Sequence, residues 1–177
     1  MVAALKPNLI DNSKALALVD PVNVLPATAA VLREFSDLTH HMESVRELHG
    51  VVWINDSNAT NIRACKAALQ GVDEPVILIA GGDGKGADFS ELVAIVEQKV
   101  PVLILIGKDA DRLEAALQGF TAIHRVNTIE QAVKLAASMV QAGDTVLLSP
   151  ACASLDQFEN YQARGNAFKN AVMGLPE

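Results

Sequence analysis

Residues 76–86 read Val76-Ile77-Leu78-Ile79-Ala80-Gly81-Gly82-Asp83-Gly84-Lys85-Gly86, a short aliphatic run that passes directly into a glycine-rich loop. An uninterrupted apolar run of this length is typical of a strand that is covered on both faces, as in a parallel sheet between helices. In such sheets, ligands bind beyond the carboxyl ends of the strands. This stretch therefore predicts an α/β fold and an edge at which polar loop residues could meet a ligand.

Other short apolar runs support the same fold class. They are Val51–Asn55, Val102–Ile106, Ala122–Val126 and Thr145–Leu148. Amphipathic segments separate them, and strand–helix alternation at this spacing favours a Rossmann-like, mainly parallel sheet with helices on both faces. Met42–Leu48 and Val51–Asn55 flank His49-Gly50, which predicts an N-terminal β-hairpin at the start of the sheet.

Each expected helix begins at a residue that can cap it. The expected starts are Thr60, Asp88 or Ser90, Asp109 and Thr128, for helices that end near Leu69, Lys99, Gly119 and Val140. Thr128-Ile129-Glu130-Gln131 also has the form of a capping box. A last helix is expected over Asn166–Met173.

Residues 1–37 differ from the rest of the chain. They contain two helical pieces, Ala15–Val19 and Thr28–Phe35, on either side of a proline-bounded break, and no convincing strand. The sequence thus predicts a short helical segment followed by a Rossmann-like domain over residues 38–177.

Composition excludes several classes of partner. The net charge is −7 and only 4% of the residues are aromatic, so the chain lacks the basic stripe and the stacking platforms of a nucleic-acid-binding protein. No apolar run approaches the roughly 20 residues that span a bilayer, and the N-terminus has no secretory signal. Two cysteines without metal-ligand spacing suit a reduced compartment. We expect a cytoplasmic protein with no nucleic-acid and no membrane partner.

Loops rich in glycine, amide and hydroxyl groups follow the predicted strands. They span residues 55–61, 81–86, 107–109 and 149–154. In a parallel sheet these loops meet at one edge, where Lys85 and the hydroxyls would suit a small anionic ligand. Each loop alone has a structural explanation as well: a helix cap, a tight turn that needs positive φ, or the start of a helix.

Isolated polar and reactive residues have mostly structural interpretations. Adjacent His40 and His41 are interpreted as surface residues, since no cysteine or carboxylate stands at metal-ligand spacing from them. Trp53 is expected in the core. Cys152 near a helix start could be reactive, but a buried thiol is the favoured interpretation.

Long motifs at the same loops have a family likeness. They are Trp53–Asn61, Gly81–Lys85 with Ala87–Phe89, and Leu148–Phe158, continued by Arg164-Gly165-Asn166 and Phe168. This ordered set resembles the Mur ligases, specifically the C-terminal domain of the D-glutamate-adding branch, from about Leu38 to the end of the chain. Asn8–Asp20 and Val31–Ser36 resemble, more loosely, the last helices of the family's central domain.

The resemblance implies an activity. The family consumes ATP, with Mg²⁺, to join D-glutamate to UDP-MurNAc-L-alanine in peptidoglycan synthesis, through an acyl phosphate that the D-glutamate nitrogen attacks. It also implies that this domain closes over a central ATP-binding domain, its expected partner. ATP and Mg²⁺ belong to the complete enzyme, and no cofactor is expected to bind tightly to this chain and no metal site is expected in it.

The resemblance also implies roles for individual residues, none of them catalytic. Substrate-binding positions near D-glutamate would be Thr60, Lys85, Ser154, Tyr161 and Asn58, and nucleotide-facing positions would be Asp56 at the ATP ribose, His41 and Asp11. Three of these depart from the family pattern. His41 replaces an arginine, Asn58 replaces a lysine, and Asp11 stands where the family has asparagine.

Two hypotheses remain open. The 177 residues contain no GxxxxGK[ST] phosphate-binding loop, so a ligase domain of this kind is expected to be inactive alone. The lost cations at His41 and Asn58 favour an alternative, a non-catalytic binding or regulatory module derived from a ligase. A plain nucleotide-binding Rossmann protein is disfavoured because no GxGxxG follows the first parallel strand.

Overall fold

The computed structural model describes residues 39–73 and 75–177. The chain divides into two units, Met1–Glu34 and Phe35–Glu177, and the second contains every element described below. Asp11 and the two predicted N-terminal helical pieces lie outside the described residues. The assignment of residues 1–37 to the end of a central domain therefore stays a prediction.

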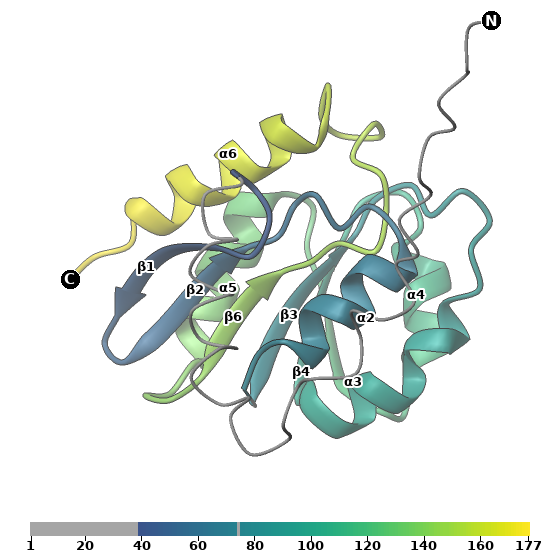
Figure 1. Ribbon diagram of the computed structural model, residues 1–177, viewed down its shortest axis with the longest axis horizontal. Helices are drawn as coiled ribbons and strands as arrows, with labels where there is room; N and C mark the ends of the chain where they lie inside the picture. The colour runs from purple at the N-terminus through teal and green to yellow at the C-terminus, as the bar shows by residue number, and fades with distance from the viewer. Residues whose placement is uncertain (1–38, 74) are drawn as a thin grey trace, which may run out of the picture. The chain divides into compact units, whose positions relative to one another are not determined.

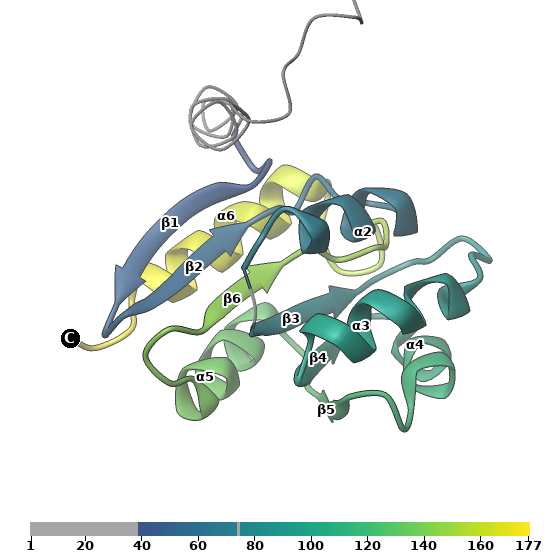
Figure 2. The same cartoon turned by 60° about the horizontal axis from the view of Figure 1, so that its bottom comes forward.

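A six-stranded sheet runs through the second unit (Figures 1 and 2). Its strands are β1 (Glu43–Leu48), β2 (Val51–Asn55), β3 (Val76–Gly81), β4 (Val102–Ile106), β5 (Ala122–Arg125) and β6 (Thr145–Leu148). Their spatial order is β1-β2-β6-β3-β4-β5. Only the β1–β2 pair is antiparallel, so the predicted Rossmann-like, mainly parallel sheet is confirmed.

The β1–β2 hairpin turns at the predicted dipeptide. His49 and Gly50 have φ of 53° and 77°, the left-handed values that a two-residue hairpin turn requires. The pairing of β1 with β2 shifts between Ser44 and Arg46, which marks a β-bulge in the edge strand.

Helices cover both faces of the sheet, as expected (Figure 2). They are α2 (Ile62–Gln70), the 3₁₀ helix η2 (Phe89–Leu92), α3 (Val93–Lys99), α4 (Ala110–Leu117), α5 (Ile129–Met139) and α6 (Tyr161–Met173). The helices from α2 to α4 pack against one face of the sheet, and α5 and α6 pack against the other. All residues of β3 are buried between these two layers.

Two predicted helix caps need correction. Asn61, not Thr60, caps α2, because the Asn61 side chain accepts the Ala64 N–H at 3.0 Å. Thr128 caps α5 as expected, but the Gln131 side chain accepts the Asn127 N–H at 2.9 Å instead of closing the capping box on Thr128. Asp88 begins the segment over η2 and α3.

The predicted start of the last helix at Asn166 was wrong. Helix α6 begins at Tyr161, with the Asn160 side chain accepting the Ala163 N–H at 2.8 Å. Gly165 favours a helix break in the sequence, yet it lies inside α6 and is buried. The His40 ring packs against it, and a Cβ at this position would overlap that ring. The glycine is therefore required by packing and does not end the helix.

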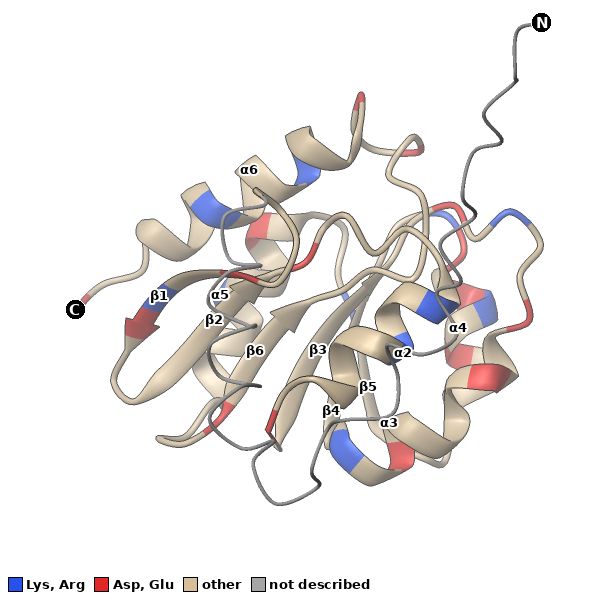
Figure 3. Ribbon diagram, viewed as in Figure 1, with Lys and Arg blue, Asp and Glu red and all other residues tan. Residues whose placement is uncertain are grey.

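Charged side chains avoid the inner strands. Figure 3 shows β2, β3, β4 and β6 without charged residues, which lie instead on loops, on helices and on the outer strands β1 and β5. Among the described helices, none is both long and apolar enough to cross a membrane.

The buried face of α6 provides a test of the core. Phe168 is fully buried and its ring centroid lies 6.5 Å from that of Trp53. We expect Phe168→Ala to lower the free energy of unfolding by about 3–5 kcal/mol, because the large cavity cannot close. Met173→Ala on the same helix should change it by less than about 0.5 kcal/mol, since Met173 is 61% exposed. Urea denaturation followed by circular dichroism would measure both, and equal effects would contradict this core.

Candidate functional site

The loops at the carboxyl ends of the strands meet, as the sequence predicts. Asp83 and Ala153 exchange two backbone hydrogen bonds of 2.9 Å, which joins the loop after β3 to the loop after β6. The Asp109 N–H donates to the Gly82 carbonyl at 3.0 Å and adds the loop after β4. We call this edge, formed by the loops at residues 55–61, 81–86, 107–109 and 149–154, the rim. Lys85 and Ser154 are close in sequence to the Asp83–Ala153 bridge and therefore lie on the rim.

Gly82 makes this close contact possible. Its φ of 130° is a conformation that residues with a Cβ rarely adopt. A Cβ there would collide with the Ala153 carbonyl oxygen, the acceptor of the Asp83 N–H. The expectation that residues 81–86 need positive φ is thus correct, and the loop also needs glycine for space.

Arg164 from α6 holds the rim from below and was not singled out as a site residue by the sequence. Only 1% of it is exposed. Its guanidinium donates to the Ser57 hydroxyl at 3.0 Å, the Ser57 carbonyl at 2.9 Å and the Cys152 carbonyl at 3.1 Å. The Ser57 hydroxyl in turn donates to the Tyr161 carbonyl at 2.8 Å. One side chain thus links the loops after β2 and β6 to the start of α6.

The Arg164 guanidinium is buried among neutral oxygen atoms. Burial lowers its pKa to about 10, so it remains charged at neutral pH. The five N–H donors of a guanidinium lie in one rigid plane, which an ammonium group cannot reproduce.

Asp56 lies at the end of β2 and is only 3% exposed. Its carboxylate accepts the Ser149 hydroxyl at 2.8 Å and the Met42 N–H at 3.2 Å. Burial raises the pKa of this carboxyl, against the opposing effect of these hydrogen bonds. Asp56 therefore connects the first and last loops of the rim, and both of its oxygens already have a donor.

The histidine pair differs from the expectation, because His40 is not a surface residue. It is 4% exposed and has a left-handed φ of 67°. The Asn55 side-chain amide lies 2.8 Å from His40 Nδ1, so this nitrogen is the acceptor and the ring is neutral. Burial lowers the His40 pKa, consistent with that state. His40 is buried because its imidazole ring fills the space above Gly165.

Lys85 presents its side chain at the rim. It is exposed, has a φ of 50°, and its N–H donates to the Asp83 carboxylate at 2.9 Å. Among residues 39–73 and 75–177, no carboxylate lies within ion-pair distance of the Lys85 amine, whereas the Lys108 amine lies 3.1 Å from Asp83. Of these two lysines, Lys85 is thus the one whose amine is not paired within the described unit.

The remaining candidate residues lie on the loops after β2 and β6, at the start of α6 and just before β1. Asn58 is exposed and Thr60 half-buried, and the Thr60 N–H donates to the Asn58 carbonyl at 2.8 Å. Ser154 is 3% exposed and Tyr161 begins α6, with its ring against His40. His41 is half-buried, and its Nδ1 has no hydrogen-bond partner among the described residues.

Metal and thiol chemistry have little support in the described part of the chain. No group of three or more His, Cys, Asp or Glu residues there could hold a metal ion. Cys152 is a fully buried thiol, as favoured by the sequence, and burial raises its pKa to about 12. Trp53 is a core residue, as expected.

Comparison with known proteins gives a consistent result. The family model described as "Mur ligase, glutamate ligase domain" matches residues 40–152. UDP-N-acetylmuramoylalanine--D-glutamate ligase of Methylococcus capsulatus is 47% identical over 169 residues, which are 95% of this chain and 37% of that protein. The enzyme of the same name from Idiomarina loihiensis is 46% identical, over 95% of this chain and 36% of that protein. The chain thus spans little more than a third of these relatives.

Solved structures agree in fold. A murein peptide ligase from Psychrobacter arcticus aligns with a TM-score of 0.53 at 12% identity, covering 78% of this chain and 31% of that one. UDP-N-acetylmuramate-alanine ligase from Thermotoga maritima aligns with a TM-score of 0.54 at 11% identity, over 79% and 31% of the two chains.

Arg164 allows a direct test of the rim. We expect Arg164→Lys to lower the free energy of unfolding by about 2 kcal/mol, because buried carbonyls lose their donors. The exposed Arg63→Lys on α2 serves as the matched control and should have little effect. Urea denaturation would measure both, and a fully stable Arg164→Lys protein would show that the fork is dispensable.

Asp56 predicts a pH effect. Because burial raises its pKa above the ordinary 3.8, the folded state binds the proton more tightly than the unfolded chain does. Its stabilising contribution is present at low pH and is lost as the pH rises through the raised value. We expect Asp56→Asn, relative to the parent, to gain stability from about pH 4 to about pH 7. Urea denaturation midpoints of Asp56→Asn and the parent would be measured across this range, with the exposed Asp73→Asn as the control. A difference between Asp56→Asn and the parent that does not change with pH would contradict this expectation.

Proposed function

Because the chain belongs to the Mur ligase family, we propose that residues 38–177 are the C-terminal domain of an ATP-dependent ligase that adds D-glutamate to UDP-MurNAc-L-alanine in peptidoglycan synthesis. The observation that carries this proposal is the joined rim, in which the loops after β2, β3, β4 and β6 are held together by hydrogen bonds. Relatives named for D-glutamate ligation share 46–47% of their residues with this chain over 95% of its length.

D-glutamate fits the chemistry of the rim. Its two carboxylates need a cation and several hydrogen-bond donors. Lys85 supplies an exposed amine, and the hydroxyls of Thr60 and Ser154 lie on loops that the backbone joins to the same rim. Tyr161 contributes the backbone at the start of α6, where Ser57 already fixes its carbonyl.

The ATP ribose is proposed to lie near Asp56 and His41. Within residues 39–73 and 75–177, His41 Nδ1 has no hydrogen-bond partner, and His41 lies near enough to Asp56 to act electrostatically on that carboxyl. Asp56 would have to share its oxygens with the Ser149 hydroxyl and the Met42 N–H, so it fits as a secondary acceptor. ATP would supply the phosphoryl group that activates a substrate carboxylate, and Mg²⁺ would neutralise the charge of that group. Both would be held mainly by the central domain, the proposed partner.

The proposed cellular compartment follows from the substrates. Nucleotide-linked precursors and D-glutamate are soluble small molecules, and the two buried cysteines are free thiols. We place the protein in the cytoplasm on these grounds.

A regulatory module is the second candidate. Asn58 and His41 stand where the family carries cations, and Asp11 departs from the pattern at a third position. These changes weaken the electrostatic attraction for nucleotide and substrate while leaving Lys85 in place. A module of this kind would bind D-glutamate or a similar acid without supporting turnover.

A chimera separates the two candidates. Residues 38–177 would replace the corresponding part of the Methylococcus capsulatus ligase, with phosphate release measured in the presence of ATP, Mg²⁺, UDP-MurNAc-L-alanine and D-glutamate. We expect release that depends on D-glutamate, and none from the 177-residue chain alone. A chimera that folds but stays inactive would support the regulatory module.

Lys85 tests the substrate site within that chimera. We expect Lys85→Met to lower kcat/KM for D-glutamate by about tenfold to a hundredfold, mainly through KM, because a charge-assisted bond is worth about 1.5–3 kcal/mol. Lys134→Met, an exposed residue in the middle of α5, is the matched control. An unchanged KM in Lys85→Met would remove Lys85 from the site.

A further inference from the structure

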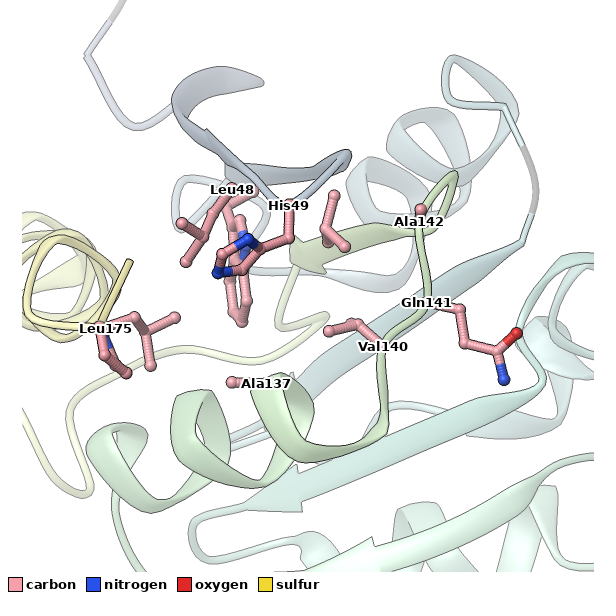
Figure 4. A pocket seen from close by; sticks show the side chains of 10 residues that line it. Leu48, His49, Ala137, Val140, Gln141, Ala142 and Leu175 are labelled. Carbon is pink, nitrogen blue, oxygen red and sulfur yellow. The ribbon is translucent and has the colours of Figure 1, made fainter.

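The two ends of the sheet differ in chemistry. At the amino ends of β2 and β6, a cavity of about 320 Å³ lies between the β1–β2 turn, the end of α5 and the C-terminal tail, and its lining is mainly aliphatic (Figure 4). At the carboxyl ends, the loop after β3 is contacted by charged side chains of the segment that begins α4, which are Lys108, Asp109 and Arg112. These charged contacts centre on the turn that carries Lys85.

Lys85 stands at a central position of a tight turn. The Ala87 N–H donates to the Gly84 carbonyl at 2.9 Å, which closes a four-residue turn around Lys85 and Gly86. The φ values of these two residues are 50° and 80°, as in a type I′ turn. A left-handed φ is unfavourable for a residue with a Cβ, so contacts around the turn must hold Lys85 in this conformation.

The first turn of α4 holds both ends of the Lys85 turn. The Gly84 N–H donates to the Asp109 carboxylate at 2.7 Å, and the Arg112 guanidinium donates to the Ala87 carbonyl at 2.7 Å. Asp109 and Arg112 also form an ion pair with a distance of 3.6 Å. The direction of the Lys85 side chain is therefore set by two charged residues that follow β4.

Asp109 does not make the contact that is usual at its position. It stands at the N-cap of α4, as the sequence predicts, but its carboxylate accepts no N–H of that helix. The side chain is 14% exposed, and its Oδ2 accepts the Gly84 N–H instead. A Cβ on Gly84 would lie 3.2 Å from this oxygen and would collide with the Phe89 ring. A bond that would stabilise α4 is thus replaced by one that fixes the Lys85 turn.

We propose that Asp109 is a positioning residue for Lys85: by holding the Gly84 N–H, it fixes the direction in which the turn presents the Lys85 amine at the rim. Its effect on substrate rests on the proposed function, in which this amine binds a carboxylate of D-glutamate. A carboxylate repels a dicarboxylate, so Asp109 can favour binding only through the turn and not by direct contact.

The hydrogen bond can be tested without substrate, in the 177-residue chain. We expect the Gly84 amide of Asp109→Ala to exchange its hydrogen about tenfold faster than that of the parent, measured by NMR, because the amide loses its acceptor. Asp109→Asn keeps an oxygen that can accept the N–H and should retain most of the protection. Asp111→Ala, an exposed residue at the start of the same helix, is the matched control and should leave Gly84 unchanged.

Substrate kinetics in the chimera test whether Asp109 acts through Lys85. We expect Asp109→Ala to raise KM for D-glutamate by about fivefold to tenfold with little change in kcat, as the loss of one positioned hydrogen bond implies. Removal of a negative charge without movement of the turn would instead lower KM. In a Lys85→Met background, Asp109→Ala should have little further effect, because the amine on which it acts is gone. Asp109→Asn should keep KM within about threefold of the parent.

Asp109→Ser is a second variant for the case in which Asp109→Ala fails to fold. Serine is a good N-cap residue and can therefore support α4. Its side chain is shorter than that of aspartate, so its hydroxyl does not reach the Gly84 N–H. Asp109→Ser should thus show the faster Gly84 exchange and the raised KM while the helix remains capped.

Three results would overturn the proposal. If Gly84 exchanges at the parent rate in a folded Asp109→Ala or Asp109→Ser protein, the carboxylate does not hold the turn. A lowered KM would show that Asp109 acts on D-glutamate by its charge. An equal rise in KM with and without Lys85→Met would show that Asp109 does not act through Lys85. If the parent chimera shows no dependence on D-glutamate, the proposed function fails, and the Gly84 exchange rates still decide whether Asp109 holds the turn.

Discussion

The buried guanidinium of Arg164 is the interaction on which the architecture of the ligand rim depends. Loops at the end of a parallel sheet have no ladder of their own to fix them. Here a single planar group from α6 satisfies carbonyl and hydroxyl oxygens of Ser57 and the carbonyl of Cys152. These partners are neutral, so they do not offset the positive charge of Arg164. That charge lies beneath a rim proposed to bind a dicarboxylate.

The same helix also fixes the start of the described unit. Gly165, the residue after Arg164, leaves the space that the neutral His40 ring fills, and Asn55 hydrogen bonds that ring from the end of β2. Neighbouring residues of α6 thus organise two features that are distant in sequence.

The strands could be predicted from sequence because their apolar runs are dictated by burial on both faces, as in Val76–Ala80 and Val102–Ile106. The hairpin could also be predicted from sequence, because His49-Gly50 between two strand-like runs is typical of a tight two-residue turn. Helix boundaries were harder to predict from sequence. Asn61 and Thr60 can both cap a helix, and only the backbone geometry selects Asn61. The start of α6 was predicted wrongly at Asn166. Gly165 lies inside the helix because of its contact with His40, a residue more than a hundred positions away.

The candidate site divides in the same way. Convergence of the loops followed from the parallel sheet, and the family likeness supplied roles for Lys85 and Asp56. The contribution of Arg164 and the burial of His40 were not predicted, because both depend on long-range hydrogen bonds that leave no local pattern. For Arg164, the sequence contained one signal, its place beside Gly165 in a family motif. That signal supported the resemblance to the family but did not show what the Arg164 side chain does.

The two outer strands have a consequence for self-association. The bulge between Ser44 and Arg46 distorts the free side of β1, and β5 at the other border has only four residues and ends in Arg125. Short, irregular or charged borders are poor templates for intermolecular strand pairing. The edges of this sheet therefore disfavour its extension by a strand from another copy.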